Sequence, residues 1–263
     1  VHARNKPLAE DVSLAELAKA TGGFTGADLE NLINEGALLA ARKNQKFITM
    51  QDLKDAEIKV IAGPEKKSRV IPEHERRLTA YHEAGHAVVM HALPDQDPVT
   101  QITIVPRGQA GGMTISLPEE DRSYLSKRYM EDQIVGLLGG RVAEKLCLGD
   151  ISTGASNDIE QATKLARAMI TRYGMSDDFG MVALETVNNQ YLGGDTSLAC
   201  SAETAAKIDR DVVAMIGDAY KKAEAIIKEN RTAMDALATY LLEKETITGE
   251  EFMDILGKQE QNA

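Results

Sequence analysis

The chain has 263 residues, 43% of them hydrophobic and 27% charged, which suits one large or two smaller soluble domains with their own cores. Its net charge of −11 argues against nucleic acid or an anionic membrane as the main partner. Two isolated cysteines and the lack of a run of about 18 apolar residues exclude a disulfide scaffold, a thiolate zinc cluster and a membrane-spanning segment within this sequence.

Residues 8–62 are expected to form three or four short helices. Ser13, Thr25 and Thr49 each precede an apolar-periodic run and are followed three residues later by an acid, as in a capping box. Taken alone, this segment would suit a small helical bundle without chemistry. The sequence GPEKKSR at 63–69 then predicts a hinge, because Gly-Pro ends a helix and the following charges are solvated.

A second set of elements is predicted after the hinge. A helix over 72–93 is bounded by Pro72, which suits a first helical position, and by Pro94 beyond its end. Residues 100–105 and 113–117 alternate with period two around a Pro- and Gly-rich connection. This pattern predicts a pair of strands.

Helices are expected to fill most of the remaining chain. One should cover roughly 122–147 and the next roughly 157–173. In the second, Asn157 and Glu160 are spaced as a capping box, and Gly174 follows as the stop. Two or three more helices should complete the C-terminal part. The predicted fold is therefore mainly α with a small β-sheet.

The helix predicted over 72–93 carries His82, Glu83 and His86 in the order His-Glu-x-x-His. Side chains four residues apart share a helix face, with Cβ atoms about 5–6 Å apart, so two imidazoles can bind one ion. Glu83 would lie beside that ion, where a base can take a proton from metal-bound water. Gly85 costs about 1 kcal/mol relative to alanine within a helix, which indicates that another element lies close to the backbone.

The motif does not fix the third metal ligand. Its extension x-x-Gly-x-x-His is absent, because Val89 and Ala92 occupy those positions. His91 is rotated off the shared face and is expected at the rim, whereas His2 and His74 are expected at the surface. A carboxylate from a later helix should complete the site. Asp158 would open a helix, where the helix dipole keeps a carboxylate ionised. The identity of the third ligand nevertheless stays open among three candidates: Glu131, Glu144 and Asp158.

Four segments follow one another along the chain: TAYHEAGHAVV, ITIVPRG, GGRVAE and STGASNDIEQATKLAR. In that order they resemble the protease domain of the FtsH family of membrane-anchored, ATP-dependent zinc metalloproteases. The helical lid of the AAA ATPase module that precedes that protease is matched by GGFTGADLENLINEGALLAARKNQKFITMQDLKDA. The resemblance covers essentially the whole chain.

The resemblance implies one Zn²⁺ per protomer and assigns residues to it. His82 and His86 match the histidine ligands, and Glu83 matches the catalytic glutamate that activates water. Asp158 matches the aspartate that completes the coordination, as in an Asp-zincin. Glu144 matches a glutamate near the metal, which would orient a histidine rather than bind the ion.

Two further sites follow from the same resemblance. An edge for substrate is implied beside the active-site helix, where an unfolded polypeptide could add as an extra strand. The edge residues would be Ile102, Thr103, Ile104 and Val105. In the longer protein, Gly26 and Ala27 would border the adenine pocket.

The implied organisation is a lid subdomain over 1–63, a linker over 64–71 and a mostly helical protease domain over 72–263. The whole protein would be a homohexamer in the inner or plasma membrane, with this portion in the cytoplasm, degrading unfolded and membrane proteins with ATP and Mg²⁺. No Gly-x-x-x-x-Gly-Lys-Ser/Thr loop occurs here, so the chain is expected to begin after the anchor and the nucleotide-binding subdomain and to lack ATPase activity. Five apolar residues of the C-terminal helices would lie either in the interface between subunits of the hexamer or in the core of the chain. They are Val212, Val213, Ile216, Ile226 and Ile227.

The leading interpretation is a zinc-dependent endopeptidase. The alternative is a non-catalytic ring-assembly or regulatory module with a structural metal. Glu83 favours the enzyme, because a structural metal site has no use for a base beside an open coordination position.

Overall fold

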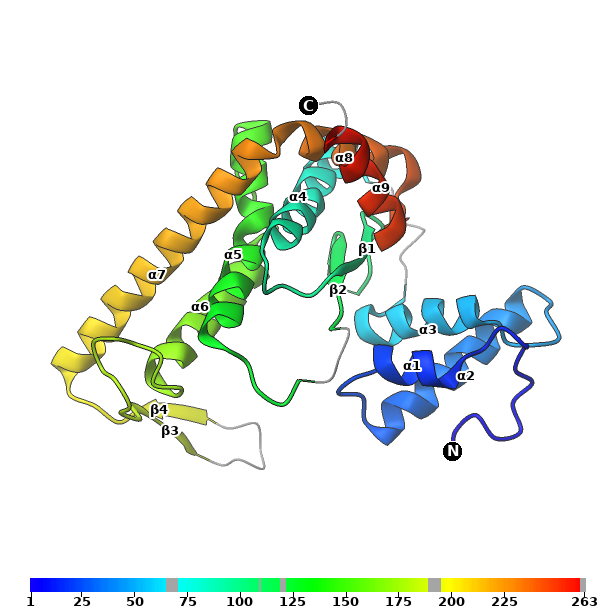
Figure 1. Ribbon diagram of the computed structural model, residues 1–263, viewed down its shortest axis with the longest axis horizontal. Helices are drawn as coiled ribbons and strands as arrows, with labels where there is room; N and C mark the ends of the chain where they lie inside the picture. The colour runs from blue at the N-terminus through cyan, green and yellow to red at the C-terminus, as the bar shows by residue number, and fades with distance from the viewer. Residues whose placement is uncertain (65–70, 109, 119–121, 189–194, 261–263) are drawn as a thin grey trace.

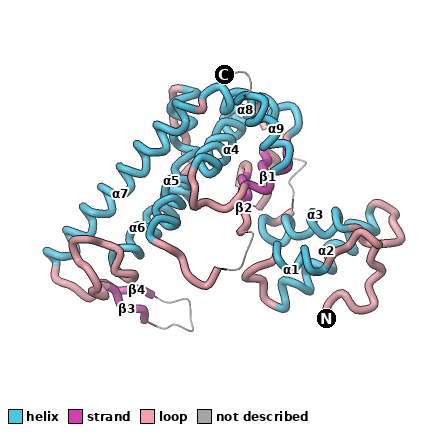
Figure 2. The backbone as a smooth tube through the Cα atoms, in the orientation of Figure 1, coloured by secondary structure: helices cyan, strands magenta, loops and turns pink. Residues whose placement is uncertain are grey.

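The computed structural model describes residues 1–64, 71–108, 110–118, 122–188 and 195–260, which form a small helical unit and a larger unit with a sheet (Figure 1). The small unit holds three helices: α1 (Leu14–Ala20), α2 (Gly26–Arg42) and α3 (Met50–Ala62). Most of the linker predicted over 64–71 lies outside the described residues. Figure 2 shows that helices make up most of both units, which confirms the predicted fold class.

The helices of the small unit begin where the sequence predicts. The side chains of Ser13, Thr25 and Thr49 each accept a hydrogen bond from the backbone amide three residues on. For Thr25 and Thr49 the acid at that position accepts in return from the cap backbone amide. These reciprocal bonds satisfy amides that the first helical turn leaves free. Between α2 and α3 the core is closed by buried apolar side chains such as Leu32 and Leu53.

The larger unit is organised around one buried helix, α4 (Glu73–Ala92). Every residue from Ala80 to Val89 is buried, so this stretch is covered on all sides rather than along one stripe. The helices around it and beyond are α5 (Lys127–Ala143), the short π-helix η1 (Glu144–Leu148), α6 (Ser156–Thr171), α7 (Ala202–Glu229), α8 (Arg231–Lys244) and α9 (Gly249–Glu260). Residues from α4 and α5, with apolar residues of α6 to α9, form one continuous core. Among the described residues, no helix combines the length and apolarity needed to cross a bilayer.

A three-stranded antiparallel sheet lies beside α4. Its strands are β1 (Val99–Thr103), β2 (Met113–Ser116) and β5 (Thr246–Thr248), in the order β2-β1-β5. The predicted pairing of the first two strands is confirmed, with Ile102 opposite Thr114. A separate hairpin of β3 (Glu185–Asn188) and β4 (Asp195–Leu198) precedes α7.

The prediction that the strand of Ile102–Val105 is a free edge is wrong. Ile102 pairs with β2 on one side and with Ile247 of β5 on the other. Just beyond β1, the Ile104 amide donates to the Glu245 carbonyl. The third strand comes from near the C-terminal end of the chain, and its three residues are too few to show a periodic pattern. In the described part of the sheet, β2 has β1 as its one partner, and so its other edge is unpaired there.

Some helix boundaries also differ from the predictions. Residues 122–126 are not helical, because α5 begins after the cap Ser126, and Arg122 instead pairs with Asp97. Pro72 is the cap of α4 rather than its first residue. At α6 the predicted capping box is wrong: the helix begins at Ser156, and its cap, Ala155, makes no side-chain hydrogen bond.

The C-terminal apolar positions fall mostly in the core. Val212 and Ile227 are buried, and Ile216 and Ile226 pack against the same cluster. Val213 differs, since it is 72% exposed. Four of the five positions therefore serve the intrachain core.

Candidate metal centre and active site

Two histidines on α4 point their ring nitrogens at each other. His82 and His86 lie one turn apart, and their Nε2 atoms are 3.1 Å apart. The rings meet at an interplanar angle of 76° rather than stacking. Both side chains are buried, which fixes them without exposing them to bulk water.

Hydrogen bonds at the opposite ring nitrogens set the protonation of both imidazoles. His86 Nδ1 lies 2.9 Å from the Gly136 carbonyl oxygen, which can only accept, so Nδ1 carries the proton. His82 Nδ1 lies 2.8 Å from Glu144 Oε1 and donates to that carboxylate. In their neutral forms, both rings therefore direct Nε2 lone pairs toward one point.

Glu144, which is fully buried in η1, is held from two directions. Besides the bond from His82, it accepts one from the Ser152 amide at 2.8 Å. Burial raises the pKa of Glu144, but the bonds from His82 and Ser152 outweigh it and hold the pKa below the ordinary value. The ionised Glu144 carboxylate thus ties His82 to the loop that leads into α6.

Asp158, on the first turn of α6, supplies a third donor. Its Oδ2 atom lies 3.3 Å from His82 Nε2 and 3.6 Å from His86 Nε2. Ligands about 2.0–2.1 Å from a tetrahedral zinc ion are about 3.3 Å from one another. Among the described residues, these three form the one group of His, Cys, Asp or Glu donors that meets the spacing for a metal, within 4.8 Å of one another.

The charges at this point suit a cation. Burial lowers the pKa of His82, but hydrogen bonds to Asp158 and Glu144 raise it to about 10. Burial raises the pKa of Asp158, but the same histidines hold it well below its ordinary value. The carboxylates of Asp158 and Glu144 thus favour a positive charge at the histidine pair. A divalent ion bound between the rings would supply this positive charge in place of a proton, with both imidazoles neutral.

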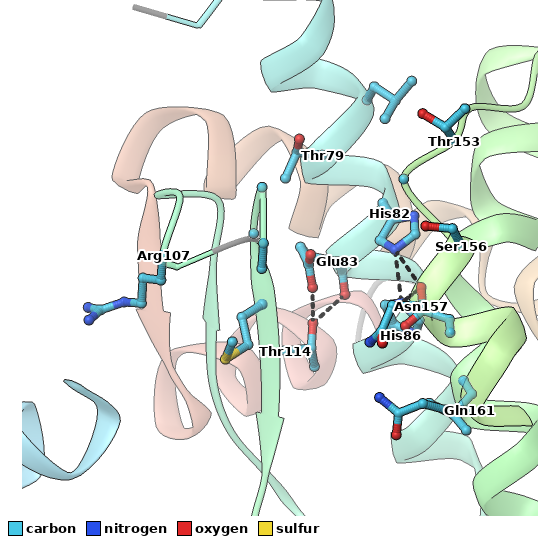
Figure 3. A pocket seen from close by; sticks show the side chains of 18 of the residues that line it. Thr79, His82, Glu83, His86, Arg107, Thr114, Thr153, Ser156, Asn157 and Gln161 are labelled. Atoms are coloured by element: carbon cyan, nitrogen blue, oxygen red, sulfur yellow. Dashed lines mark hydrogen bonds and ion pairs between the residues drawn. The ribbon is translucent and has the colours of Figure 1, made fainter. Parts of the chain in front are cut away.

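Glu83 lies between the two histidines in sequence and is buried. Thr114 Oγ1 on β2 is 2.9 Å from Glu83 Oε2 and 3.0 Å from the Glu83 carbonyl oxygen. Figure 3 shows this contact, with Thr114 facing Glu83 across from the α6 side of the cavity. Burial raises the pKa of Glu83 above its ordinary value. The Glu83 carboxyl group is therefore held by Thr114 and binds a proton more readily than an exposed glutamate does.

Glycines let the neighbouring elements approach the site. A Cβ atom on Gly140 would lie 2.6 Å from both His82 Nε2 and His86 Nε2. A Cβ atom on Gly112 would lie 2.8 Å from Glu83 Oε1. The sequence predictions missed these residues and Thr114. For α5, the spacing Gly136-x-x-Gly139-Gly140 was a signal of close helix packing.

The site opens into a cavity of about 790 Å³. Its walls come from α4, the β1–β2 connection, β2, α5, the loop before α6 and the start of α6, with Ile61 of α3 at its border. It is lined by the two histidines, Glu83 and Asp158, and by other residues that include Thr79, Met113, Thr153, Asn157 and Gln161.

The other predicted residues lie apart from the donors. Glu131 and His91 are outside the group of convergent donors and do not line the cavity. His91 instead meets the ring of Phe252 on α9, with centroids 5.6 Å apart. Gly26 and Ala27 lie exposed at the start of α2.

Comparisons with known proteins match both units. The model of peptidase family M41 matches residues 69–255, and that of the AAA+ lid domain matches residues 11–55. The chain is 56% identical over 259 residues to the ATP-dependent zinc metalloprotease FtsH of Caldicellulosiruptor bescii, covering 97% of this chain and 42% of that protein. It is 55% identical over 263 residues to the ATP-dependent zinc metalloprotease FtsH 1 of Thermoanaerobacter sp., covering 99% and 43%.

A third relative, the ATP-dependent zinc metalloprotease FtsH of Rubrobacter xylanophilus, is 50% identical over 253 residues, which are 95% of this chain and 39% of that protein. The chain thus spans about two fifths of the length of these curated relatives. The peptidase model covers well over half of the chain. On that match, the chain belongs to peptidase family M41.

Proposed function

We propose that this chain carries the zinc-dependent endopeptidase site of an ATP-dependent protease of the FtsH kind. One observation carries the proposal: a buried glutamate, Glu83, lies in the same cavity as three donor atoms at metal-ligand spacing. A metal that only stabilised a fold would need no base beside it. For that reason the non-catalytic assembly or regulatory module is not favoured.

The donors would divide into ligands and supports. His82, His86 and Asp158 would bind the zinc ion, and Glu144 would orient His82 through Nδ1. When bound, zinc supplies Lewis-acid polarisation of the substrate carbonyl and increases the acidity of water. Three protein ligands leave the position that this chemistry requires.

Glu83 would move the proton. Its carboxylate would take a proton from the attacking water and later deliver it to the nitrogen of the leaving amine. Its raised pKa supports its part as proton acceptor, because burial makes the carboxylate bind a proton more readily than an exposed glutamate does. Thr114 would hold one carboxylate oxygen while the other faces the cavity.

The substrate backbone would bind along β2. This strand lines the cavity through Met113 and Thr114, and its pairing with β1 leaves the other edge toward the site. An unfolded polypeptide could add there as a strand, so that main-chain hydrogen bonds hold it regardless of sequence. This replaces the edge predicted on β1.

The proposal extends to the longer protein. Residues 1–63 would be the lid subdomain of its ATPase module, with Gly26 and Ala27 near the bound nucleotide, 64–71 a linker and 72–263 the protease domain. ATP with Mg²⁺ would drive the delivery of unfolded and membrane-protein substrates. The assembly would be a homohexamer anchored in the inner or plasma membrane, with this portion in the cytoplasm.

A Glu83→Gln variant tests the base. The purified chain should hold about one zinc ion per protomer and cleave an unfolded protein such as casein. The variant should retain zinc and lose cleavage by roughly a hundredfold or more. A variant that cleaves as fast as the parent would exclude Glu83 as the base.

The ligand assignment has its own test. Asp158→Ala should lower zinc content, whereas Glu144→Gln should leave zinc bound with an affinity weaker by about 10–100-fold. Asp218→Ala is a matched control, because this α7 carboxylate is 77% exposed and pairs with Lys221. The opposite outcome, with zinc lost in Glu144→Gln and retained in Asp158→Ala, would exchange the two roles.

A further inference from the structure

A second cavity of about 510 Å³ continues from the candidate active site. It shares Met90, Leu137 and Gln161 with the first cavity. It also reaches Ser116, the last residue of β2, whereas the first cavity reaches Met113 and Thr114. A polypeptide added along β2 would therefore pass from the metal donors into the second cavity.

One face of α6 forms a wall of this second cavity. The lining positions are spaced by three or four residues and so share a stripe of the helix. They are Gln161, Lys164, Leu165, Ala168 and Arg172. Across from them, Met90 and Leu137 supply apolar surface. The stripe thus combines apolar contact with cationic groups.

The lining is basic in a chain of net charge −11. Lys164 and Arg172 line it together with the amides of Gln96, Gln133 and Gln161, and no carboxylate is among the described lining residues. An acidic side chain placed there would meet two cations and several amide donors. A basic side chain would meet repulsion.

The two cations are available to a ligand. Among the described residues Lys164 forms one ion pair, to Glu160, with the side chains 72% and 61% exposed, and such surface pairs are weak and exchange readily. Arg172 has its guanidinium carbon 5.7 Å from the ring of Tyr173. No carboxylate within the described ranges comes close enough to form an ion pair with Arg172.

We propose that this second cavity is a specificity subsite that prefers an acidic substrate side chain, with Lys164 and Arg172 as the residues that determine the preference. The inference rests on the proposed peptidase function of the adjoining site. Glutamate should be preferred over aspartate, because its longer stem reaches past the apolar surface of Met90 and Leu137 to the cations.

Peptide cleavage tests the subsite. A fluorogenic peptide is prepared in matched series with Glu, Gln or Lys scanned through each position beside the cleaved bond. At one position, kcat/KM for Glu should exceed that for Gln by about two- to fivefold, with Lys lowest. The preference should shrink as salt rises. The double variant Lys164→Gln/Arg172→Gln should abolish the Glu preference, so that the Glu and Gln peptides have the same kcat/KM.

A charge reversal and a control complete the design. Lys164→Glu/Arg172→Glu should invert the order in favour of the Lys peptide. Lys228→Gln, an α7 side chain 60% exposed and paired with Glu224, should keep the parent preference. Equal cleavage of Glu and Gln peptides at every position would overturn the subsite and leave the peptidase proposal standing. No cleavage of any peptide by the zinc-loaded parent would instead count against the peptidase proposal.

Discussion

Gly85 of α4 lies so close to Gly139 of α5 that a Cβ atom on Gly85 would be 2.6 Å from the Gly139 carbonyl oxygen. The reverse also holds, since a Cβ atom on Gly139 would be 2.7 Å from the Gly85 carbonyl oxygen. This contact brings the α5 backbone to the histidine helix, where the Gly136 carbonyl accepts from His86. The histidine pair is thus held against α5 at a helix crossing that glycine permits.

Gly85→Ala should destabilise the larger unit. The added methyl would also stand 2.5 Å from Ala143 Cβ, so the helices must separate, at a cost of about 1–3 kcal/mol. The measurement is the free energy of unfolding in urea, at fixed zinc concentration. Gly217→Ala on α7 is the control: nothing lies within 4 Å of its Cβ, and helix propensity predicts a gain of about 0.5–1 kcal/mol. Equal effects of the two variants would contradict the close crossing.

Gly140→Ala should weaken zinc binding more than stability. Its methyl would lie 2.6 Å from both His82 Nε2 and His86 Nε2, and both rings are held by hydrogen bonds at Nδ1. A shift of either ring should lower zinc affinity by about 10-fold or more. Competition with a chelator measures this affinity. An unchanged zinc affinity would mean that the rings relax freely.

Thr114→Val should slow catalysis without removing the metal. Valine keeps the shape of threonine but cannot donate to Glu83, so the carboxylate loses its orientation. We expect kcat to fall by about 3–10-fold, which corresponds to one hydrogen bond, with zinc content unchanged. The control is Thr239→Val on α8, whose hydroxyl bonds the Asp235 carbonyl of its own helix. A fall in zinc content rather than kcat would show that Thr114 supports the ligands instead.

Glu57 should make the helical unit less stable as pH rises. It is 5% exposed, and its Oε1 atom has no hydrogen-bond partner in the described part of the chain. Burial raises the pKa of Glu57 from 4.5 to about 7, against the attraction of Lys54. Below about pH 4.5 the carboxyl group is protonated in both the folded and the unfolded chain, so its ionisation does not lower the free energy of unfolding. Between about pH 4.5 and 7 the unfolded chain ionises Glu57 while the folded chain keeps it protonated, which removes up to about 3 kcal/mol of stability by the time the pH has passed 7.

The test compares the parent with Glu57→Gln across pH. Hydrogen exchange of α3 amides reports the stability of this unit. The variant should match the parent near about pH 4 and be more stable near about pH 8, because only the parent carries the buried charge. The same pH dependence in both proteins would show that Glu57 is neutral or solvated throughout.

Local features of the sequence predicted local structure well. The caps Ser13, Thr25 and Thr49 depend on bonds to residues three positions away, and they appear where expected. His82 and His86 share a face because four residues make about one helical turn. Features that depend on distant partners were not predictable in this way. The central position of β1, the Thr114 contact to Glu83 and the glycine crossing each need a partner from elsewhere in the chain.

At the start of α6, the residues alone and the family resemblance predicted different things. The residues alone left three carboxylates open as the third donor, and the family resemblance singled out Asp158. The capping box predicted at Asn157 and Glu160 failed because the helix begins at Ser156. Asp158 lies in the first turn with either start, and its carboxylate turns to the histidines.

The sheet beside the site is completed by a strand that is synthesised late. Thr103 of β1 and Thr246 of β5 bring their hydroxyl oxygens to 2.7 Å although they are 143 positions apart. A ribosome adding about 5–20 residues per second needs roughly 7–30 s to cover that distance. During this interval the nascent chain carries β1 and β2 without β5, so the second neighbour of β1 is still missing. Translation order thus delays the completion of the sheet that β2 and its cavity-lining residues belong to.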